Sequence, residues 1–217
     1  MNEVAGKIFS IAKDNIPVPG CTISKSVYEQ QGYHLLHFSL AEHTDISAET
    51  YQVPKLIYLD EGELEIFTKS QSWHLKTGDA FILPQQVPVG MRATLDSIYT
   101  ELALRKDSTM NQILKAGEVF KLKDLLPYQE GKIVNMDLIN DPKLKFVIMS
   151  FSEGTGLSEH AAPGEALIFA LDGEGVIGYE GKEYAIKAGE NFKFAKNGLH
   201  SVRAKGNFKM ALLLTLE

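Results

Sequence analysis

The chain has little cysteine and no excess of basic residues, and each shortage excludes a class of protein. The single cysteine, Cys21, cannot form a disulfide within the chain, which indicates a reducing compartment. The 22 basic residues are outnumbered by 28 acidic ones and are scattered singly, so neither nucleic-acid binding nor a polybasic membrane anchor is expected. No apolar stretch approaches the roughly 20 residues of a membrane span, and charged residues interrupt the N-terminus where a signal peptide would need an apolar core. These absences predict a soluble cytoplasmic protein.

Several motifs of common catalytic classes are also missing. The sequence contains no G-x-G-x-x-G before a predicted helix, no G-x-x-x-x-G-K-[ST], no G-x-S-x-G and no C-x-x-C. Nucleotide hydrolysis, dinucleotide redox chemistry and serine hydrolase chemistry are therefore disfavoured.

An internal repeat is present. When the chain is shifted along itself so that Gly62 falls on Gly173, identical residues coincide along its whole length without a gap, and we call this shift the repeat offset. The repeat predicts two domains, at residues 1–106 and 112–217, joined by the polar segment KDSTMN. Among the coinciding pairs are Ala5-Gly6 with Ala116-Gly117, Phe9 with Phe120, Leu56-Ile57 with Leu167-Ile168, Gly78 with Gly189, and Arg92-Ala93 with Arg203-Ala204.

Each copy has the pattern of an all-β domain. Short runs rich in branched and aromatic residues recur about every ten residues between turn residues, which is typical of a sandwich or barrel. Only the segments after Ala5 and Ala116 are predicted to be helical or irregular. Gly62 and Gly173 lie between strand runs, where a tight hairpin with positive φ is expected. The predicted strands are 33–40, 56–59, 63–68 and 80–83, then 145–151, 166–171, 175–179, 191–195 and 209–216.

Two spaced motifs in the second copy resemble those of the cupin superfamily. The first, G(X)5HXH(X)3–4E(X)6G, is matched in spacing by Gly154, His160, Ala162, Ala166 and Gly173. The second, G(X)5PXG(X)2H, is matched by Gly189, Ala195, Asn197 and His200. The chain thus resembles small cupin_2-type conserved barrel proteins of undefined function. The resemblance implies two tandem cupin barrels of the double-stranded β-helix or jelly-roll type, a bicupin.

The departures from these motifs concern the metal ligands. In metal-binding cupins, two histidines and a glutamate of the first motif and the histidine of the second hold one divalent metal. The second copy keeps His160 and His200 but has alanine at the other two positions. Glu165 stands one residue early and faces the other side of a strand unless the turn at Pro163-Gly164 redirects it. The resemblance leaves three roles open for the histidines: a Zn, Fe, Mn or Ni site completed by Glu165, a hydrogen-bonding pair for an organic ligand, or two satisfied interior side chains.

The four ligand positions of the first copy hold no histidine. They read Glu49, Tyr51, Lys55 and Val89, which predicts that this copy binds no metal. Because an unpaired buried charge is costly, Glu49 and Lys55 are expected to form an ion pair inside or at the mouth of the barrel, with the Tyr51 hydroxyl beside them. The alternative is that the loop between them leaves both charges in solvent. Val89 makes the remaining wall apolar.

The other histidines and the only tryptophan are assigned structural roles. His34, His37, His43 and His74 have no counterparts in the second copy and are predicted to lie at the surface or at sheet edges. Trp73 coincides with Tyr184, which favours a packing role.

Three functions fit these observations. The first is a non-catalytic small-molecule binding protein with a second-barrel pocket formed by His160, His200, Glu165, Ile168, Phe192 and Phe194. The second is a metal-dependent isomerase or dioxygenase acting on a small carboxylate or sugar. The third is a regulatory or sensor module. The resemblance also implies that a homodimer is possible.

Overall fold

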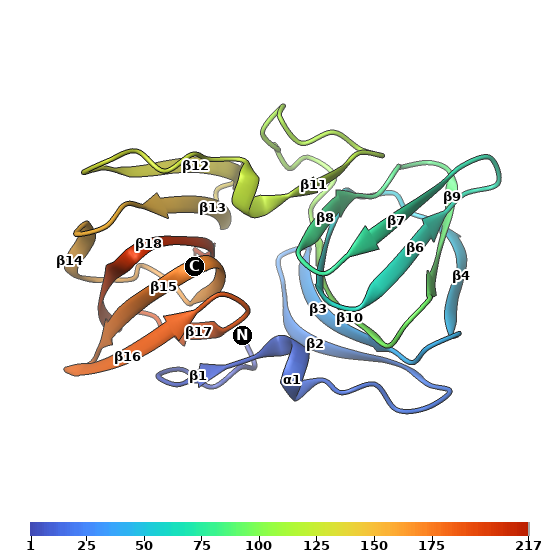
Figure 1. Cartoon of the computed structure of the whole chain (residues 1–217). Helices are drawn as coiled ribbons and strands as arrows, with labels where there is room; N and C mark the ends of the chain where they lie inside the picture. The colour runs from blue at the N-terminus through green and yellow to red at the C-terminus, as the bar shows by residue number, and fades with distance from the viewer. Residues whose placement is uncertain (217) are drawn as a thin grey trace. The chain divides into compact units, whose positions relative to one another are not determined.

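The computed structural model describes residues 1–216, and nearly all of its regular structure is β-strand (Figure 1). The chain forms two compact units whose segments alternate along the sequence. The first unit contains Met1–Asn2, Ile11–Ser108 and Gln112–Lys121, and the second contains Glu3–Ser10, Thr109–Asn111 and Leu122–Glu217. Within the described residues, no helix is long and apolar enough to cross a membrane.

The first unit consists of two antiparallel sheets around one core. Side chains from both sheets, among them Leu40, Ile57, Leu64, Phe81 and Tyr99, form this core. The larger sheet has the order β11(Val119–Lys121), β8(Asp79–Ile82), β5(Lys55–Glu61), β10(Ser97–Ala103), β3(Tyr33–Leu40) and β2(Thr22–Gln30). The smaller sheet has the order β4(Asp45–Thr50), β9(Pro88–Ala93), β6(Glu63–Phe67) and β7(Ser72–Lys76).

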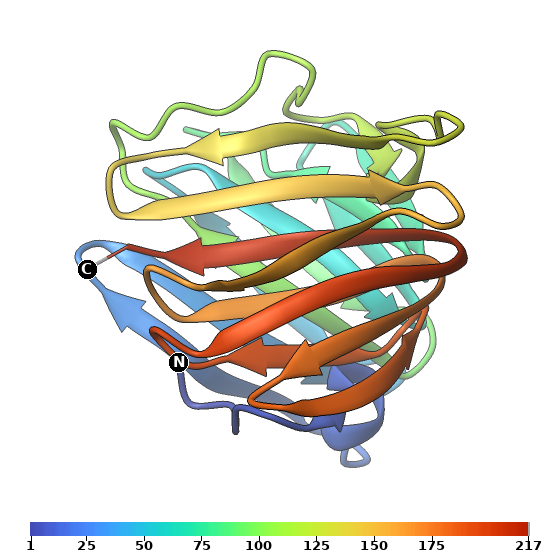
Figure 2. The ribbon, with the colours of Figure 1, turned by 90° about the vertical axis from the view of Figure 1, so that its left-hand side faces the viewer.

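The second unit uses two long strands where the first uses four short ones. Its sheet has the order β1(Ile8–Phe9), β17(Asn191–Phe194), β15(Ala166–Tyr179), β18(Leu199–Thr215), β13(Leu144–Phe151) and β12(Ile133–Asn140). Two further strands join its long members, β14(Gly156–Ala161) on β18 and β16(Lys182–Lys187) on β15. Figure 2 shows β12, β13 and β18 running side by side. The core behind them contains Phe151, Ile168, Phe192, Phe194 and Phe208.

Strand positions recur between the units with the offset of the sequence repeat. Tyr33–Leu40 and Asp45–Thr50 have counterparts in Leu144–Phe151 and Gly156–Ala161, each displaced along the chain by the repeat offset. β5 and β6 together correspond to β15, and β9 and β10 together correspond to β18. The predicted runs 33–40 and 191–195 are strands, whereas 166–171 and 175–179 belong to the single strand β15.

The two lead-in segments are partly extended. Each begins with a strand of two or three residues, β1 or β11, which pairs with β17 or β8. Each strand is followed by about one turn of helix, α1(Ile11–Asp14) or the 3₁₀ helix η1(Leu122–Asp124). The sequence showed the irregular part of these segments. It did not show the strands, because two residues are too few to display an alternating pattern.

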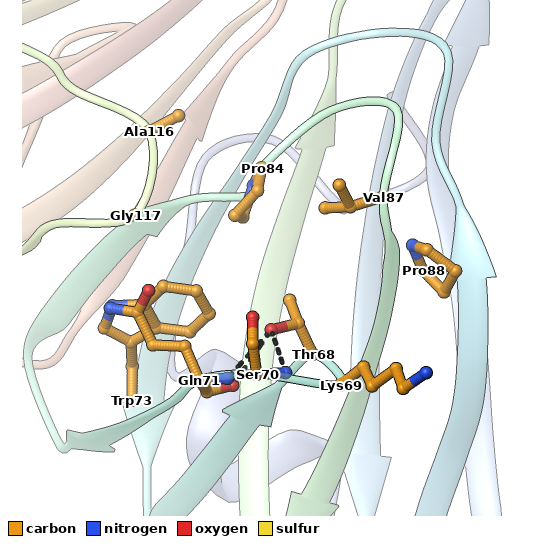
Figure 3. A pocket seen from close by; sticks show the side chains of 10 residues that line it. All are labelled: Thr68, Lys69, Ser70, Gln71, Trp73, Pro84, Val87, Pro88, Ala116 and Gly117. Atoms are coloured by element: carbon orange, nitrogen blue, oxygen red, sulfur yellow. Dashed lines mark hydrogen bonds between the residues drawn. The ribbon is translucent and has the colours of Figure 1, made fainter.

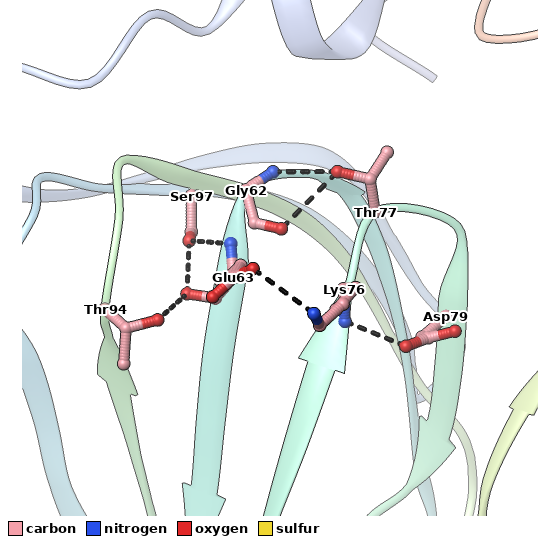
Figure 4. Close-up of polar contacts among 7 residues, drawn as sticks. All are labelled: Gly62, Glu63, Lys76, Thr77, Asp79, Thr94 and Ser97. Atoms are coloured by element: carbon pink, nitrogen blue, oxygen red, sulfur yellow. Dashed lines mark hydrogen bonds and ion pairs between the residues drawn. The ribbon is translucent and has the colours of Figure 1, made fainter.

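The hairpins predicted at Gly62 and Gly173 are wrong, although the positive φ is correct. The φ values are 100° and 72°. The strands on either side of Gly62 do not pair with each other, because β5 pairs with β10 and β6 pairs with β9. The chain bends here from one sheet to the other. In Figure 4 the Ser97 hydroxyl accepts a hydrogen bond from the Glu63 N–H, and the Thr77 hydroxyl accepts one from the Gly62 N–H.

We expect these bends to tolerate no side chain. A Cβ atom at Gly173 would collide with the carbonyl oxygen of Asn207, whereas one at Gly189, with a similar φ of 82°, would meet no atom within 4 Å. Gly189→Ala should therefore cost only the left-handed conformation, about 1–2 kcal/mol. Gly173→Ala should cost more than about 3 kcal/mol, because two backbones must also separate. Denaturant unfolding of both variants checks this, and equal losses would contradict it.

Candidate functional site

His160 and His200 lie side by side in the second unit. They are directly opposite each other in the pairing of β14 with β18, and their ring centroids are 4.2 Å apart. The His200 ring also stacks on Phe194, with centroids 4.0 Å apart. His200 is buried and His160 is exposed, so the pair connects the interior of the unit with its surface.

Backbone contacts fix the hydrogen-bonding role of both imidazoles. Nδ1 of His160 lies 2.9 Å from the Ser158 carbonyl oxygen, and Nδ1 of His200 lies 3.0 Å from that of Gly198. Because a carbonyl only accepts, each Nδ1 carries a proton and donates it, so the neutral form of each ring has its lone pair on Nε2. Burial lowers the pKa of His200 and the neighbouring His160 lowers it further, against the Gly198 hydrogen bond, which raises it. His200 is therefore neutral at pH 7.

The apolar wall expected beside the histidines is present. Ile168 and Phe192 are opposite each other in the pairing of β15 with β17, and both are fully buried. Phe194 is also buried and is the ring on which His200 stacks. These side chains point to the same core as the histidine pair, because they alternate with outward-facing residues along their strands.

Glu165 does not join the histidines. Its carboxylate lies 2.6 Å from the ammonium of Lys193. Lys193 stands between Phe192 and Phe194 on β17, so its side chain leaves the opposite face of the sheet. The turn at Pro163-Gly164 therefore does not redirect Glu165 toward the pair.

The residues of this site do not fit a resident metal ion. Buried alanines, Ala162 and Ala166, occupy the other two ligand positions of the motif. Within residues 1–216, no group of three or more His, Cys, Asp or Glu side chains is placed to hold a metal. Protein sites for zinc or iron normally supply at least three ligands, and here two imidazoles are available.

In the first unit an ion pair occupies the corresponding interior, but not the predicted one. Lys55 lies 2.8 Å from Glu101, and its ammonium lies 4.0 Å from the centre of the Tyr51 ring. The pairing of Lys55 with Glu49 is therefore wrong. Glu49 is exposed and lies opposite Val89, which is buried in the core as expected.

Two tyrosines, one half-buried and one buried, lie near this ion pair. Burial raises the pKa of Tyr51 to about 12, and the charges of Glu101 and Glu49 contribute to the rise. The hydroxyl of Tyr99 is buried without a hydrogen-bond partner, and its pKa is raised by burial and by Glu101. Sequence comparison missed Glu101 and Tyr99 because they lie outside both motifs, opposite Leu212 and Met210 in the repeat. The signal in the sequence that could have revealed this site was Glu101, the one charged residue in the segment 97–104.

A second buried polar chain lies on the other face of the larger sheet. The Thr100 hydroxyl donates to Asp60 at 2.7 Å and therefore accepts from Nδ1 of His37 at 3.0 Å. His37 is 1% exposed, so its predicted surface position is wrong. His37 is next to the core-facing Phe38 on β3, so its side chain lies on the opposite face of the sheet. At His37 that face is buried as well. Of the other three histidines, His43 and His74 are exposed and His34 is partly exposed.

The fold and the site define a class of protein: a jelly-roll β-domain with a histidine pair carried by adjacent strands. Residues 147–216 match the family model described as Cupin domain. A Cupin 2 conserved barrel domain protein from Leptotrichia buccalis superposes with a TM-score of 0.86 at 29% identity, covering 99% of this chain and 98% of that one. Residues 147–216 are therefore a cupin domain, and the chain as a whole shares its fold with the Leptotrichia buccalis protein.

More distant structures share the fold alone. Protein Ylba from E. coli matches with a TM-score of 0.60 at 12% identity, covering 96% of this chain and 89% of that one. A salicylate 1,2-dioxygenase from Pseudaminobacter salicylatoxidans matches with a TM-score of 0.64 at 10% identity, covering 88% and 76%. No curated protein matches the chain.

The contribution of the Lys55–Glu101 ion pair to stability can be tested by installing the residues that the second unit has at these positions. Lys55→Ala or Glu101→Leu alone leaves a buried charge without its partner and should cost about 3–5 kcal/mol. The double variant installs the pair found at Ala166 and Leu212, so its loss should be smaller than the sum by at least about 1 kcal/mol. Emission of Trp73, the only tryptophan and a residue of the first unit, reports this unfolding. Additive losses would mean that the two charges do not interact.

The chain of His37, Thr100 and Asp60 predicts opposite pH dependences for two variants. Desolvation lowers the pKa of His37 to about 3 and raises that of Asp60 to about 7. The stability that His37 contributes is present above its unfolded pKa of 6.5 and is lost as pH falls toward 3. The contribution of Asp60 is present at low pH and is lost as pH rises from 3.8 through 7.

These two effects cancel between about pH 4 and 6.5, because folded and unfolded chains then bind equal numbers of protons at this pair. The wild type should be nearly flat over this range. His37→Gln should gain stability as pH falls from 7 to 4, and Asp60→Asn should lose it, each by at most about 1.4 kcal/mol per pH unit. Urea midpoints across this range measure both slopes, and slopes of the same sign would refute the cancellation.

Proposed function

We propose that this protein is a bicupin that binds a small organic compound at the His160–His200 pair of its second unit. The observation that carries the proposal is the pair itself. Two imidazoles lie 4.2 Å apart, and each Nδ1 is engaged by a backbone carbonyl. Neither Nε2 has a hydrogen-bond partner among the described residues, so both are available to a ligand.

The bicupin part of the proposal rests on the repeated strand order. The strands from β2 to β10 recur at the repeat offset in the second half of the chain, and Glu49 is opposite Val89 as His160 is opposite His200. The Leptotrichia buccalis protein, which is similar along 99% of this chain, supports a shared architecture for both units.

The acceptor atoms of the two imidazoles indicate which class of ligand would bind. A neutral imidazole with its proton on Nδ1 offers an acceptor at Nε2, so two adjacent rings accept from two neighbouring O–H groups. A vicinal diol has such groups, whereas an ionised α-hydroxy acid has one O–H and a carboxylate that only accepts. Ala162 and Ala166 replace two ligands of the metal-binding motif with small apolar side chains, which favours an organic compound over an ion.

The methyl furanosides of ribose and 2-deoxyribose, called ribose and 2-deoxyribose below, provide a matched pair of probes, because only the first carries adjacent hydroxyls. In protein with ¹⁵N-labelled histidine, ribose should shift the Nε2 resonances of His160 and His200 saturably. The expected dissociation constant is in the millimolar range, which corresponds to a binding free energy of about −4 kcal/mol. 2-Deoxyribose should bind more weakly. His160→Ala and His200→Ala should each abolish the response, whereas His43→Ala, which removes an exposed histidine of the first unit, should not.

Two results would contradict this proposal. One is the absence of a saturable shift at about 100 mM ribose, well above the expected dissociation constant. The other is a stoichiometric divalent metal in elemental analysis of purified protein that is lost in the His160→Ala/His200→Ala variant. That second result would favour the alternative of a metal-dependent cupin enzyme.

A further inference from the structure

A hollow of about 430 Å³ lies in the first unit beside Trp73 (Figure 3). We call it the Trp73 pocket. Three segments line it: the β6–β7 turn, the loop between β8 and β9, and the segment that precedes β11. Its volume lies within the range of about 300–1,000 Å³ that is usual for small-molecule sites. Its lining residues are Thr68, Lys69, Ser70, Gln71, Trp73, Pro84, Val87, Pro88, Ala116 and Gly117.

The second unit shows what fills this space when the pocket is absent. Tyr179 is the counterpart of Thr68 in the repeat, and its ring packs on Phe192 and Phe194, with centroids 5.6 and 5.5 Å away. The Tyr179 hydroxyl also accepts a hydrogen bond from the Ala195 N–H. In the first unit the large ring is replaced by the short side chain of Thr68, and the space remains open.

Two glycines confirm that the Tyr179 ring occupies the equivalent volume. A Cβ atom at Gly6 would lie 3.1 Å from Tyr179, and one at Gly198 would lie 2.7 Å from it. Their counterparts are Gly117 and Val87, both of which line the Trp73 pocket. Gly198 is therefore small because a ring lies against it, and the larger Val87 is accommodated because no ring is there.

The lining of the Trp73 pocket has a definite chemical character. The Trp73 ring packs on Phe81, with centroids 5.0 Å apart, so the indole is held in place as one wall. Pro84 and Val87 add apolar surface, and Figure 3 shows both side chains across the hollow from Trp73. Lys69 is the only charged residue of the lining, and no ion pair engages it within residues 1–216.

Thr68 is held in place as well. Its hydroxyl accepts hydrogen bonds from the N–H groups of Ser70 and Gln71 and donates to the Gln71 carbonyl. These bonds fix the β6–β7 turn that carries Lys69, and Figure 3 shows the Lys69 side chain extending away from Trp73, along the side of the hollow that Pro88 lines.

We propose that the Trp73 pocket binds a small compound with a flat ring and a carboxylate. The ring would lie against Trp73 and Pro84, and the carboxylate would pair with Lys69. This site is in the first unit and is built from other residues than the histidine pair, so it does not depend on the function proposed above.

Trp73 is the only tryptophan of the chain, so its fluorescence reports directly on the pocket. Benzoate should change the emission saturably, benzyl alcohol should bind more weakly, and benzylamine should bind least. Lys69→Gln should weaken benzoate about two- to fivefold, the range of an exposed ion pair, and should leave benzyl alcohol unchanged. His160→Ala/His200→Ala should leave the benzoate response intact, which separates this site from the histidine pair.

The sharpest variant rebuilds the second unit inside the first. Thr68→Tyr/Val87→Gly places the ring of Tyr179 and the glycine of Gly198 at their counterparts, so the pocket should be filled and the benzoate response lost. Thr68→Val removes the same hydroxyl bonds without filling the pocket and should keep the response. Val87→Gly alone keeps the space open and is the control, with binding expected within about threefold of wild type. A saturable response that survives in the double variant would overturn the proposal, as would benzylamine binding as well as benzoate.

Discussion

The pairing of β15 with β18 is the constraint on which the second unit depends. These strands stay hydrogen-bonded from Ala166 opposite Leu214 to Tyr179 opposite His200, while the register shifts twice as they bend. The bend is possible because Gly173 lets the Asn207 backbone approach. Since β14 adds to the same end of β18, His160 meets His200 there. In the first unit the same path is divided among β5, β6, β9 and β10.

The sequence predicted those contacts that follow from the regular spacing of residues along a strand. Motif spacing predicted that His160 and His200 meet, because strand pairing converts a fixed separation along the chain into a fixed neighbour. Strand parity correctly indicated that Glu165 faces away from them, since neighbouring residues point to opposite faces. The partner of Lys55 was not predictable in this way. Glu101 is a diagonal neighbour on another strand, and finding it required the register of β5 and β10.

The predictions for His37 and Gly62 were wrong for different reasons. A histidine without a counterpart in the second copy carries no periodic signal, so its burial and its bond to Thr100 depended on tertiary packing. Gly62 was correctly read as a residue with positive φ. A hairpin and a bend between sheets both require that conformation, so the local sequence could not separate them. The distinction lies in which strand pairs with which, a long-range property.

The two units have replaced the same polar interior in different ways. Where the second has two imidazoles beside alanines, the first holds a lysine and a glutamate against a tyrosine ring. Each arrangement avoids an isolated buried charge: burial lowers the pKa of His200 and keeps it neutral, and Lys55 is paired with Glu101. The same fold can therefore hold different polar groups in its interior, which separates the fold from any one function.

The short strand β1 has a consequence for the order in which the chain folds. Ile8 pairs with Phe192, so β1 is synthesised long before the strand β17 with which it pairs. Between them the chain builds the body of the first unit, Ile11–Ser108. β1 can therefore dock only after β17 has been made, which is after the residues of the first unit have been synthesised. A fragment that begins at Leu122 would lack this edge strand, because the second unit takes it from a segment that precedes the first unit in the sequence.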